Sequence, residues 1–243
     1  MNLSTRAVLT AVAAAAVAVS ASLGQAALIV VLGLLAIVYA VGWASLFRLP
    51  ANGGSTLVVT LASAGALACV ALTASEPWLR YLPIVLAFGV FLAFINEMLR
   101  PVPRTDLIGS LFGTVTGLII GVCGAGWLAT MKLETGAQIV VVSATALAAA
   151  SIVGAVRMPR WIVVVATFLV ATGAGALTAH FTAGVPVLTG VVQGAIAGLI
   201  VSALHALFTH MPYLENKRSA ASLVVLPVLA VGILIYVAGR LIF

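Results

Sequence analysis

Ionisable and amide side chains inside long apolar runs are the first candidates for chemistry in this sequence. Asn96 and Glu97 end one such run. Gln193 and His205 lie within another. Polar groups at membrane depth are costly, and they are retained where they bind a ligand, relay a proton or join helices. We therefore take these residues as a candidate intramembrane polar site.

A structural role competes with a functional one for each of these groups. A lone histidine such as His205 is more often a hydrogen-bonded packing residue than a proton relay. His205 follows Gly198 and Ser202 on one helical stripe, so we expect it to face a neighbouring helix. For Gln193, an amide well within a span, we expect a hydrogen bond to another helix.

A short polar segment follows Glu97 and could bind an anion. Arg100 can pair with Glu97 three residues earlier on one helix face. Beyond Arg104, either Thr105 or Asp106 could cap the next helix by accepting its free N–H groups. A helix N-terminus beside two arginines suits a lipid phosphate or headgroup, so Arg100, Arg104, Thr105 and Asp106 are candidate contacts. Cytoplasmic anchoring and ordinary capping would explain the same residues.

Sequence motifs for the common catalytic machineries are missing from the chain. There is no HExxH, GxSxG or P-loop, and no paired carboxylates spaced to hold a metal-bound diphosphate. Cys69 and Cys123 lie in apolar runs without metal-ligand spacing; we read them as small packing residues, although a disulfide remains open. We therefore predict no catalytic residue, no metal site and no cofactor.

The segment around this polar loop carries a family resemblance. Residues 93–109 read AFINEMLRPVPRTDLIG, which resembles a loop-to-helix segment of uncharacterised polytopic bacterial inner-membrane proteins. It is also similar to phosphatidate cytidylyltransferases, which enter a glycine-rich helix through Ser-Pro-x-Lys-Thr-x-Glu-Gly. Here Pro103, Arg104, Thr105, Asp106 and Gly109 give that pattern with altered spacing, and the later Asp-rich signature that holds the family's divalent cations has no counterpart. The resemblance implies a many-spanned relative that has lost this catalysis.

Membrane helices must position all of these residues. Hydrophobic residues make up 64% of the 243 and charged residues 7%, whereas soluble domains carry roughly a quarter charged residues. The eleven Lys and Arg are dispersed without a basic stripe, so we expect the lipid bilayer, not nucleic acid, as the surrounding partner. The apolar runs predict one all-α integral membrane domain over 1–243, a bundle of about nine transmembrane helices. The predicted spans are near 7–23, 26–47, 57–75, 81–99, 107–130, 137–156, 161–180, 187–208 and 220–239.

Positive charges predict the orientation of these spans. Lys and Arg in short loops are retained on the cytoplasmic side. One side of the predicted topology carries eight of them and the other three, which predicts a cell inner membrane protein with a cytoplasmic N-terminus and an external C-terminus. The eight are Arg6, Arg48, Arg100, Arg104, Arg157, Arg160, Lys217 and Arg218; the three are Arg80, Lys132 and Arg240. The tryptophans near span ends are predicted to lie at the membrane interface: Trp43, Trp78, Trp127 and Trp161.

The first span has a second interpretation. Arg6 followed by an Ala/Val run and the small residues 19–21 also fits a cleaved secretory signal peptide. Only about two residues separate this run from the next, however, which is typical of a tight helical hairpin. We therefore favour a retained first span.

Two glycine ladders predict where helices pack most closely. Gly109, Gly113, Gly117 and Gly121 recur every four residues in the fifth span, and Gly190, Gly194 and Gly198 do so in the eighth. Four residues are about one helical turn, so each ladder forms a smooth groove that another helix can approach. We expect glycine-zipper packing, either as seams inside the chain, where the two ladders could pack on each other, or as an interface with a partner or a second copy.

Three functions are compatible with these features. The first is a non-catalytic accessory, assembly or scaffold subunit of a membrane complex, which the missing catalytic motifs and the ladders favour. The second is a small-solute or lipid transporter or flippase, which the number of spans and the cytoplasmic arginines favour. The third is a lipid-headgroup enzyme related to the cytidylyltransferases, using Glu97, Asp106 and Arg104. We rank them in this order.

Overall fold

The computed structural model describes residues 3–102, 106–156, 159–208 and 216–242, and within these ranges all regular structure is helical. Each helix is an apolar run whose backbone hydrogen bonds close within the segment, as a membrane environment requires. The helices are α1 (Leu3–Leu23), α2 (Gln25–Leu46), α3 (Asn52–Leu72), α4 (Leu82–Met98), α5 (Leu107–Cys123), α6 (Ala125–Met131), α7 (Gly136–Val153), α8 (Arg160–Phe181), α9 (Val187–Phe208) and α10 (Lys217–Ile242).

Eight stretches of the described chain are long and apolar enough to cross a membrane. α5 and α6 together form one of them, Leu107–Met131. α4 is a shorter apolar helix of 17 residues, at the lower end of the roughly 17–25 residues of a spanning helix. The predicted fold class, an all-α multi-pass membrane protein, is confirmed, and a helix lies at each predicted span.

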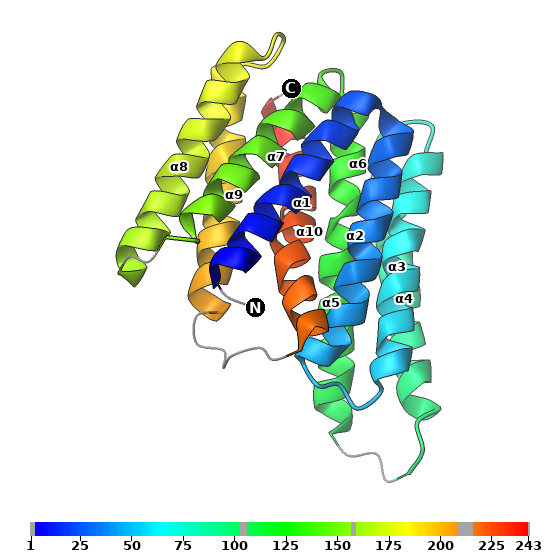
Figure 1. Cartoon of the computed structure of the whole chain (residues 1–243). Coiled ribbons are helices and arrows are strands. Elements are labelled where there is room, and N and C mark those ends of the chain that lie inside the picture. Colours follow the sequence, from blue (N-terminus) through cyan, green and yellow to red (C-terminus); the bar gives the residue numbers. More distant parts are fainter. Residues whose placement is uncertain (1–2, 103–105, 157–158, 209–215, 243) are drawn as a thin grey trace.

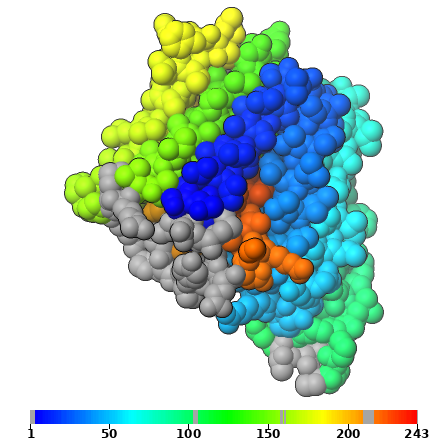
Figure 2. Space-filling model, viewed as in Figure 1, coloured from blue at the N-terminus to red at the C-terminus, as the bar shows by residue number. Residues whose placement is uncertain are grey.

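α6 continues α5 in the same direction, and with these two taken as one stretch the helices run alternately up and down (Figure 1). The two ends of the chain lie at opposite ends of the bundle. α10 is the central helix and contacts α1, α2, α5, α6, α7 and α9. α8 lies at one edge, where it packs on α7 and α9, and α4 lies at the other, where it packs on α3 and α5. α1 lies across the surface between α2 and α7 (Figure 2).

One predicted boundary is displaced by a close packing contact. The third span was expected to begin at residue 57, because Gly53 and Gly54 suggest a loop, but α3 begins at Asn52. A Cβ at Gly54 would collide with the side-chain oxygen of Asn96 on α4. The glycine is therefore a packing residue inside the helix and not a turn residue.

The glycine ladder of α9 faces α8 of the same chain. A Cβ added at Gly190 or Gly194 would collide with backbone atoms of α8, and one at Gly198 would lie 2.9 Å from the Cα of Phe168. Gly175 of α8 faces Gly190, so glycines line both sides of the contact. With so little side-chain volume between them, the two backbones lie close enough for extensive van der Waals contact.

The ladder of α5 faces other helices than α9. A Cβ at Gly113 would lie 2.5 Å from Leu49, and one at Gly117 would collide with the indole of Trp43. Gly121 in turn makes room for Ser63 of α3. The first glycine of the ladder, Gly109, meets the carboxylate of its own helix cap, Asp106, instead of a neighbouring helix. The two ladders therefore contact different helices, and the idea that they pack on each other is wrong.

Two of the tryptophans predicted for the membrane interface are core residues. Trp127 is 0% exposed and Trp43 is 2% exposed. Their indole N–H groups donate to backbone carbonyls, Trp127 to Val228 at 2.7 Å and Trp43 to Gly113 at 2.8 Å. A buried indole needs such an acceptor, and both indoles find one on another helix. Trp161, at 70% exposed, fits the interfacial prediction.

Candidate functional site

Glu97 is bound within a polar contact between α4 and α5. Its side chain is 3% exposed. One carboxylate oxygen accepts a short hydrogen bond from the hydroxyl of Ser110. The other lies 3.3 Å from Nη1 of Arg100, the pair predicted from the i, i+3 spacing. The charge is thus neutralised within the protein, as a buried carboxylate requires.

The polar contact continues from α5 to α3. The hydroxyls of Ser55 and Thr114 lie 2.8 Å apart and are both buried, and Thr114 also donates to the carbonyl of Ser110 at 2.9 Å. Hydroxyls can return a hydrogen bond to their own helix, so they add a second bond between helices without leaving a polar atom unpaired. α3, α4 and α5 are therefore joined at this end of the bundle by a chain of polar contacts.

Asp106 caps α5, as one of the two capping alternatives predicts. Its side chain accepts a hydrogen bond from the backbone N–H of Gly109 at 3.2 Å, and its own φ is 49°. Asp106 is exposed, and it is the helix's own N–H group that its carboxylate binds. Arg104 and Thr105, the other two predicted anion contacts, lie outside the described residues, so the predicted anion site can be followed only at Arg100 and Asp106.

Gln193 joins α9 to α10. Its side-chain nitrogen donates to the carbonyl of Ile235 at 3.0 Å, and the residue is fully buried. This is the interhelical hydrogen bond predicted for an amide within a span. The second amide atom, Oε1, has no hydrogen-bond partner, and the same is true of the hydroxyl of Thr189 one turn earlier.

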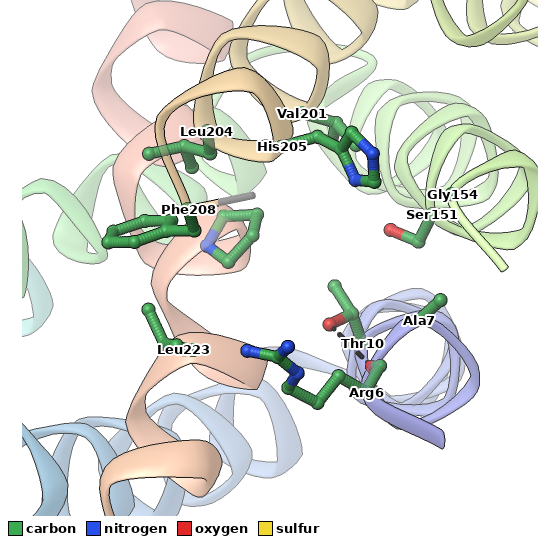
Figure 3. Close-up of a pocket in the computed structure, with 11 residues that line it drawn as sticks. Arg6, Ala7, Thr10, Ser151, Gly154, Val201, Leu204, His205, Phe208 and Leu223 are labelled. Atoms are coloured by element: carbon green, nitrogen blue, oxygen red, sulfur yellow. Dashed lines mark hydrogen bonds between the residues drawn. The ribbon is translucent and has the colours of Figure 1, made fainter. Parts of the chain in front are cut away.

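His205 lines a pocket of about 100 Å³ between the ends of four helices. The polar side chains around it are Arg6 and Thr10 from α1, Ser151 from α7 and His205 from α9. Figure 3 shows His205 and Arg6 on opposite sides of the pocket, with Leu223 and Phe208 along another side.

Pro227 connects this pocket to the central helix. Proline has no N–H group, so the carbonyl of Leu223 cannot receive its usual helical hydrogen bond. The neighbouring carbonyl of Val224 accepts a hydrogen bond from the hydroxyl of Thr10 at 3.0 Å. α1 is therefore held against α10 at the point where the proline interrupts the helical ladder.

The four predicted intramembrane residues do not form one site. Asn96 and Glu97 lie at the α3, α4 and α5 contact, and Gln193 lies against α10. His205 is twelve residues beyond Gln193, about 18 Å along the helix, and shares its pocket with Arg6. The place of Arg6 in this pocket was not predicted, because in the sequence Arg6 indicates only the orientation of the first span. Its one local signal was Thr10, four residues on and therefore on the same helix face.

Lys132 is a second residue whose contacts were not predicted, because in the sequence it indicates only a charged loop. Its ammonium group donates to the carbonyls of Val70, Ala71 and Thr73 at 2.7, 3.0 and 2.8 Å. It also lies 4.8 Å from the ring centre of Trp78. These carbonyls form the end of α3, where backbone acceptors lack helical donors and the helix dipole favours a cation. Lys132 therefore ties the segment after α6 to the end of α3.

Clusters of metal-ligating side chains and disulfide bonds are not found in the described part of the chain. Its residues contain no group of three or more His, Cys, Asp or Glu side chains that could hold a metal ion. Cys69 and Cys123 are free cysteines. No family model, curated protein or solved structure matches the chain.

Proposed function

We propose that the protein is a non-catalytic accessory or scaffold subunit that acts by assembly with another membrane protein. The observation that carries the proposal is the state of Glu97, the one acid within an apolar helix of the described chain. It is buried and bound on both oxygens by Ser110 and Arg100. A catalytic base or an ion-coupling carboxylate must face its substrate, whereas this one faces its own bundle.

The other polar groups at depth support the same interpretation. Gln193 holds α9 to α10, and the Ser55–Thr114 pair holds α3 to α5. Both glycine ladders are used inside the chain. Polar and small residues of these kinds bind helices together in lipid. These residues therefore hold the chain's own helices together, and we propose that a partner binds the outer surface of the bundle.

The edge helices offer that outer surface. On α4, Phe88 and Phe91 are 64% and 61% exposed. On α8, Leu169 and Leu177 are 61% and 60% exposed. Lipid covers such faces wherever no protein does, so the experiment must distinguish a protein neighbour from lipid.

Crosslinking in intact membranes provides the test. A photoreactive amino acid would replace Phe91 on α4 or Leu169 on α8 in the full-length protein, with irradiation before any detergent is added. Val17, fully buried inside the bundle, is the matched position that should capture no second chain. We expect one membrane protein to be captured at an edge position, and to purify in a fixed ratio with the unmodified protein in mild detergent. Lipid adducts alone at both edges, with a protein that purifies by itself, would contradict the proposal.

The proposed location is the cell inner membrane of a bacterium, with the N-terminus in the cytoplasm and the C-terminus outside. Arg6 is in the first turn of α1, and Arg48 and Arg100 follow the ends of α2 and α4; these helix ends lie where the chain begins (Figure 1). Lys132 follows α6 and Arg240 is in the last turn of α10, and these helix ends lie at the opposite end of the bundle. The excess of positive charge at the first end supports this orientation.

A further inference from the structure

The pocket at the start of α1 contains a partly buried cationic side chain, Arg6, with unused hydrogen-bonding capacity. The Nε atom of Arg6 is inaccessible to solvent and has no hydrogen-bond partner. The pocket's two hydroxyls donate to helix backbone, Thr10 to the carbonyl of Val224 and Ser151 to that of Leu147. A guanidinium offers five N–H donors and accepts no hydrogen bond. The Nε–H group of Arg6 therefore has no acceptor among the described residues.

An anion bound in the pocket would supply the missing acceptor. None of the described residues that line it is an Asp or a Glu. His205 faces Arg6 across the cavity (Figure 3) and can donate from its imidazole ring. Arg6 is partly buried, and its solvent-shielded Nε–H is costly to leave without an acceptor, so a negative ligand would stabilise it.

The size and the remaining walls of the pocket narrow the ligand further. Its volume of about 100 Å³ is well below the roughly 300–1,000 Å³ of sites that enclose a whole small molecule. It suits a compact anionic group, with the rest of the ligand outside. Leu204, Phe208 and Leu223 add an apolar wall beside the two nitrogen-bearing side chains, which suits a ligand that is apolar next to its charge.

We infer that this pocket binds the phosphate group of an anionic phospholipid, held between Arg6 and His205 with its hydrocarbon part against the apolar wall. Arginine favours phosphate because its planar fork can donate two parallel hydrogen bonds to the phosphate oxygens. The pocket lies at the end of the bundle that carries most of the positive charge, where anionic headgroups concentrate. This inference does not depend on the scaffold role, which concerns the outer faces of the edge helices.

The test is a lipid titration of the full-length protein followed by native mass spectrometry. The protein would be delipidated in detergent and titrated with phosphatidylglycerol, with phosphatidylcholine as the zwitterionic comparison. Phosphatidylglycerol should bind at one saturable site in preference to phosphatidylcholine. Arg6→Gln should weaken that binding by about tenfold or more, the scale of one charge-assisted hydrogen bond. His205→Gln should weaken it several-fold.

A matched arginine controls for charge at this end of the bundle. Arg48 is exposed and does not line the pocket, so Arg48→Gln should leave phosphatidylglycerol binding unchanged. Equal losses in the Arg6 and Arg48 variants would overturn the proposal. So would inorganic phosphate that displaces phosphatidylglycerol at equal concentration, because the ligand would then be a free anion.

If Arg6→Gln fails to fold by circular dichroism, Arg6→Lys keeps the charge and loses the fork. The lysine variant should still bind more weakly than the native protein, and unchanged binding in both it and His205→Gln would also overturn the proposal.

Discussion

At the scale of single residues, removal of the ion pair between Glu97 and Arg100 should lower the free energy of unfolding most. Glu97→Gln keeps the shape of the side chain but leaves Arg100, which is 10% exposed, without its negative partner. Breaking a buried ion pair on one side costs on the order of 3 kcal/mol. We therefore expect a clear fall in the thermal stability of the purified protein, measured by unfolding in detergent.

The matching double substitution separates a pair from two independent defects. Arg100→Gln alone should also destabilise, because it leaves a buried carboxylate. Glu97→Gln combined with Arg100→Gln should cost less than the sum of the two single changes, since no uncompensated charge remains. Strictly additive losses would show that the two groups are not coupled and would remove the main support for a structural Glu97.

Lys132 gives a second prediction at this scale. Lys132→Met keeps the length of the side chain but removes three donors from the end of α3. Carbonyls at a helix end retain access to other donors more easily than core groups, so we expect a loss of about 1–2 kcal/mol in unfolding free energy. Lys217, which is exposed at the start of α10, is the control, and Lys217→Met should be neutral. Equal effects would mean that Lys132 contributes only general charge.

The sequence predicts those polar contacts that are local in the chain. The Glu97–Arg100 pair follows from helical spacing, and the cap at Asp106 follows from the free N–H groups of any helix start. The pocket lined by Arg6 and His205 brings together residues that are far apart in the chain. No periodicity encodes such a contact, because it depends on which helix ends meet in space.

At the scale of helices, the seam between α8 and α9 should be sensitive to single methyl groups. A Cβ at Gly194 would collide with the backbone of Ala171 and lie 2.8 Å from the Cα of Thr172. Backbone cannot move aside as a flexible side chain can, so Gly194→Ala should cost about 1–3 kcal/mol. Thermal unfolding in detergent would measure this loss.

Gly173 on α8 is the matched control for that change. Its Cβ position has no atom within 4 Å, so alanine meets no neighbour there. Because alanine favours a helix by up to about 1 kcal/mol over glycine, Gly173→Ala should be neutral or stabilising. If Gly194→Ala did not lower stability, or if Gly173→Ala did, close backbone packing of α8 on α9 at Gly194 would be contradicted.

The ladders show how far helix-level prediction reaches. Spacing of four identifies a smooth face, and Gly194 and Gly198 do lie against a close neighbour. Which neighbour they meet is a property of the bundle, since a glycine face fits many helices equally well. The buried Trp43 and Trp127 were mispredicted for a related reason, because a place near a span end does not say whether a side chain faces lipid or another helix.

At the scale of the whole molecule, the alternation of helices is predictable because the bilayer permits little else. A chain with 64% hydrophobic residues must cross as helices that satisfy their own backbone, and the apolar runs place those helices within a few residues. The centre of the bundle is not predictable in this way. α10 and the edge helix α8 are both apolar, yet α10 contacts six other helices and α8 contacts two.

The orientation of this bundle can be tested with single cysteines at the two ends of α3. Asn52 begins the helix and Ser75 follows its other end, and both residues are exposed. In a background with Cys69 and Cys123 replaced by serine or alanine, each position would carry one cysteine. An impermeant thiol reagent applied to intact spheroplasts should label Ser75→Cys at once and Asn52→Cys only after permeabilisation. The reason is that the proposed orientation places Arg6 and Arg48 on the cytoplasmic side, where positive loop charges are retained, and Asn52 lies on that same side. The reverse labelling pattern would show the opposite orientation, with the Arg6 pocket in the external leaflet. Immediate labelling of both positions would show that α3 does not cross the membrane.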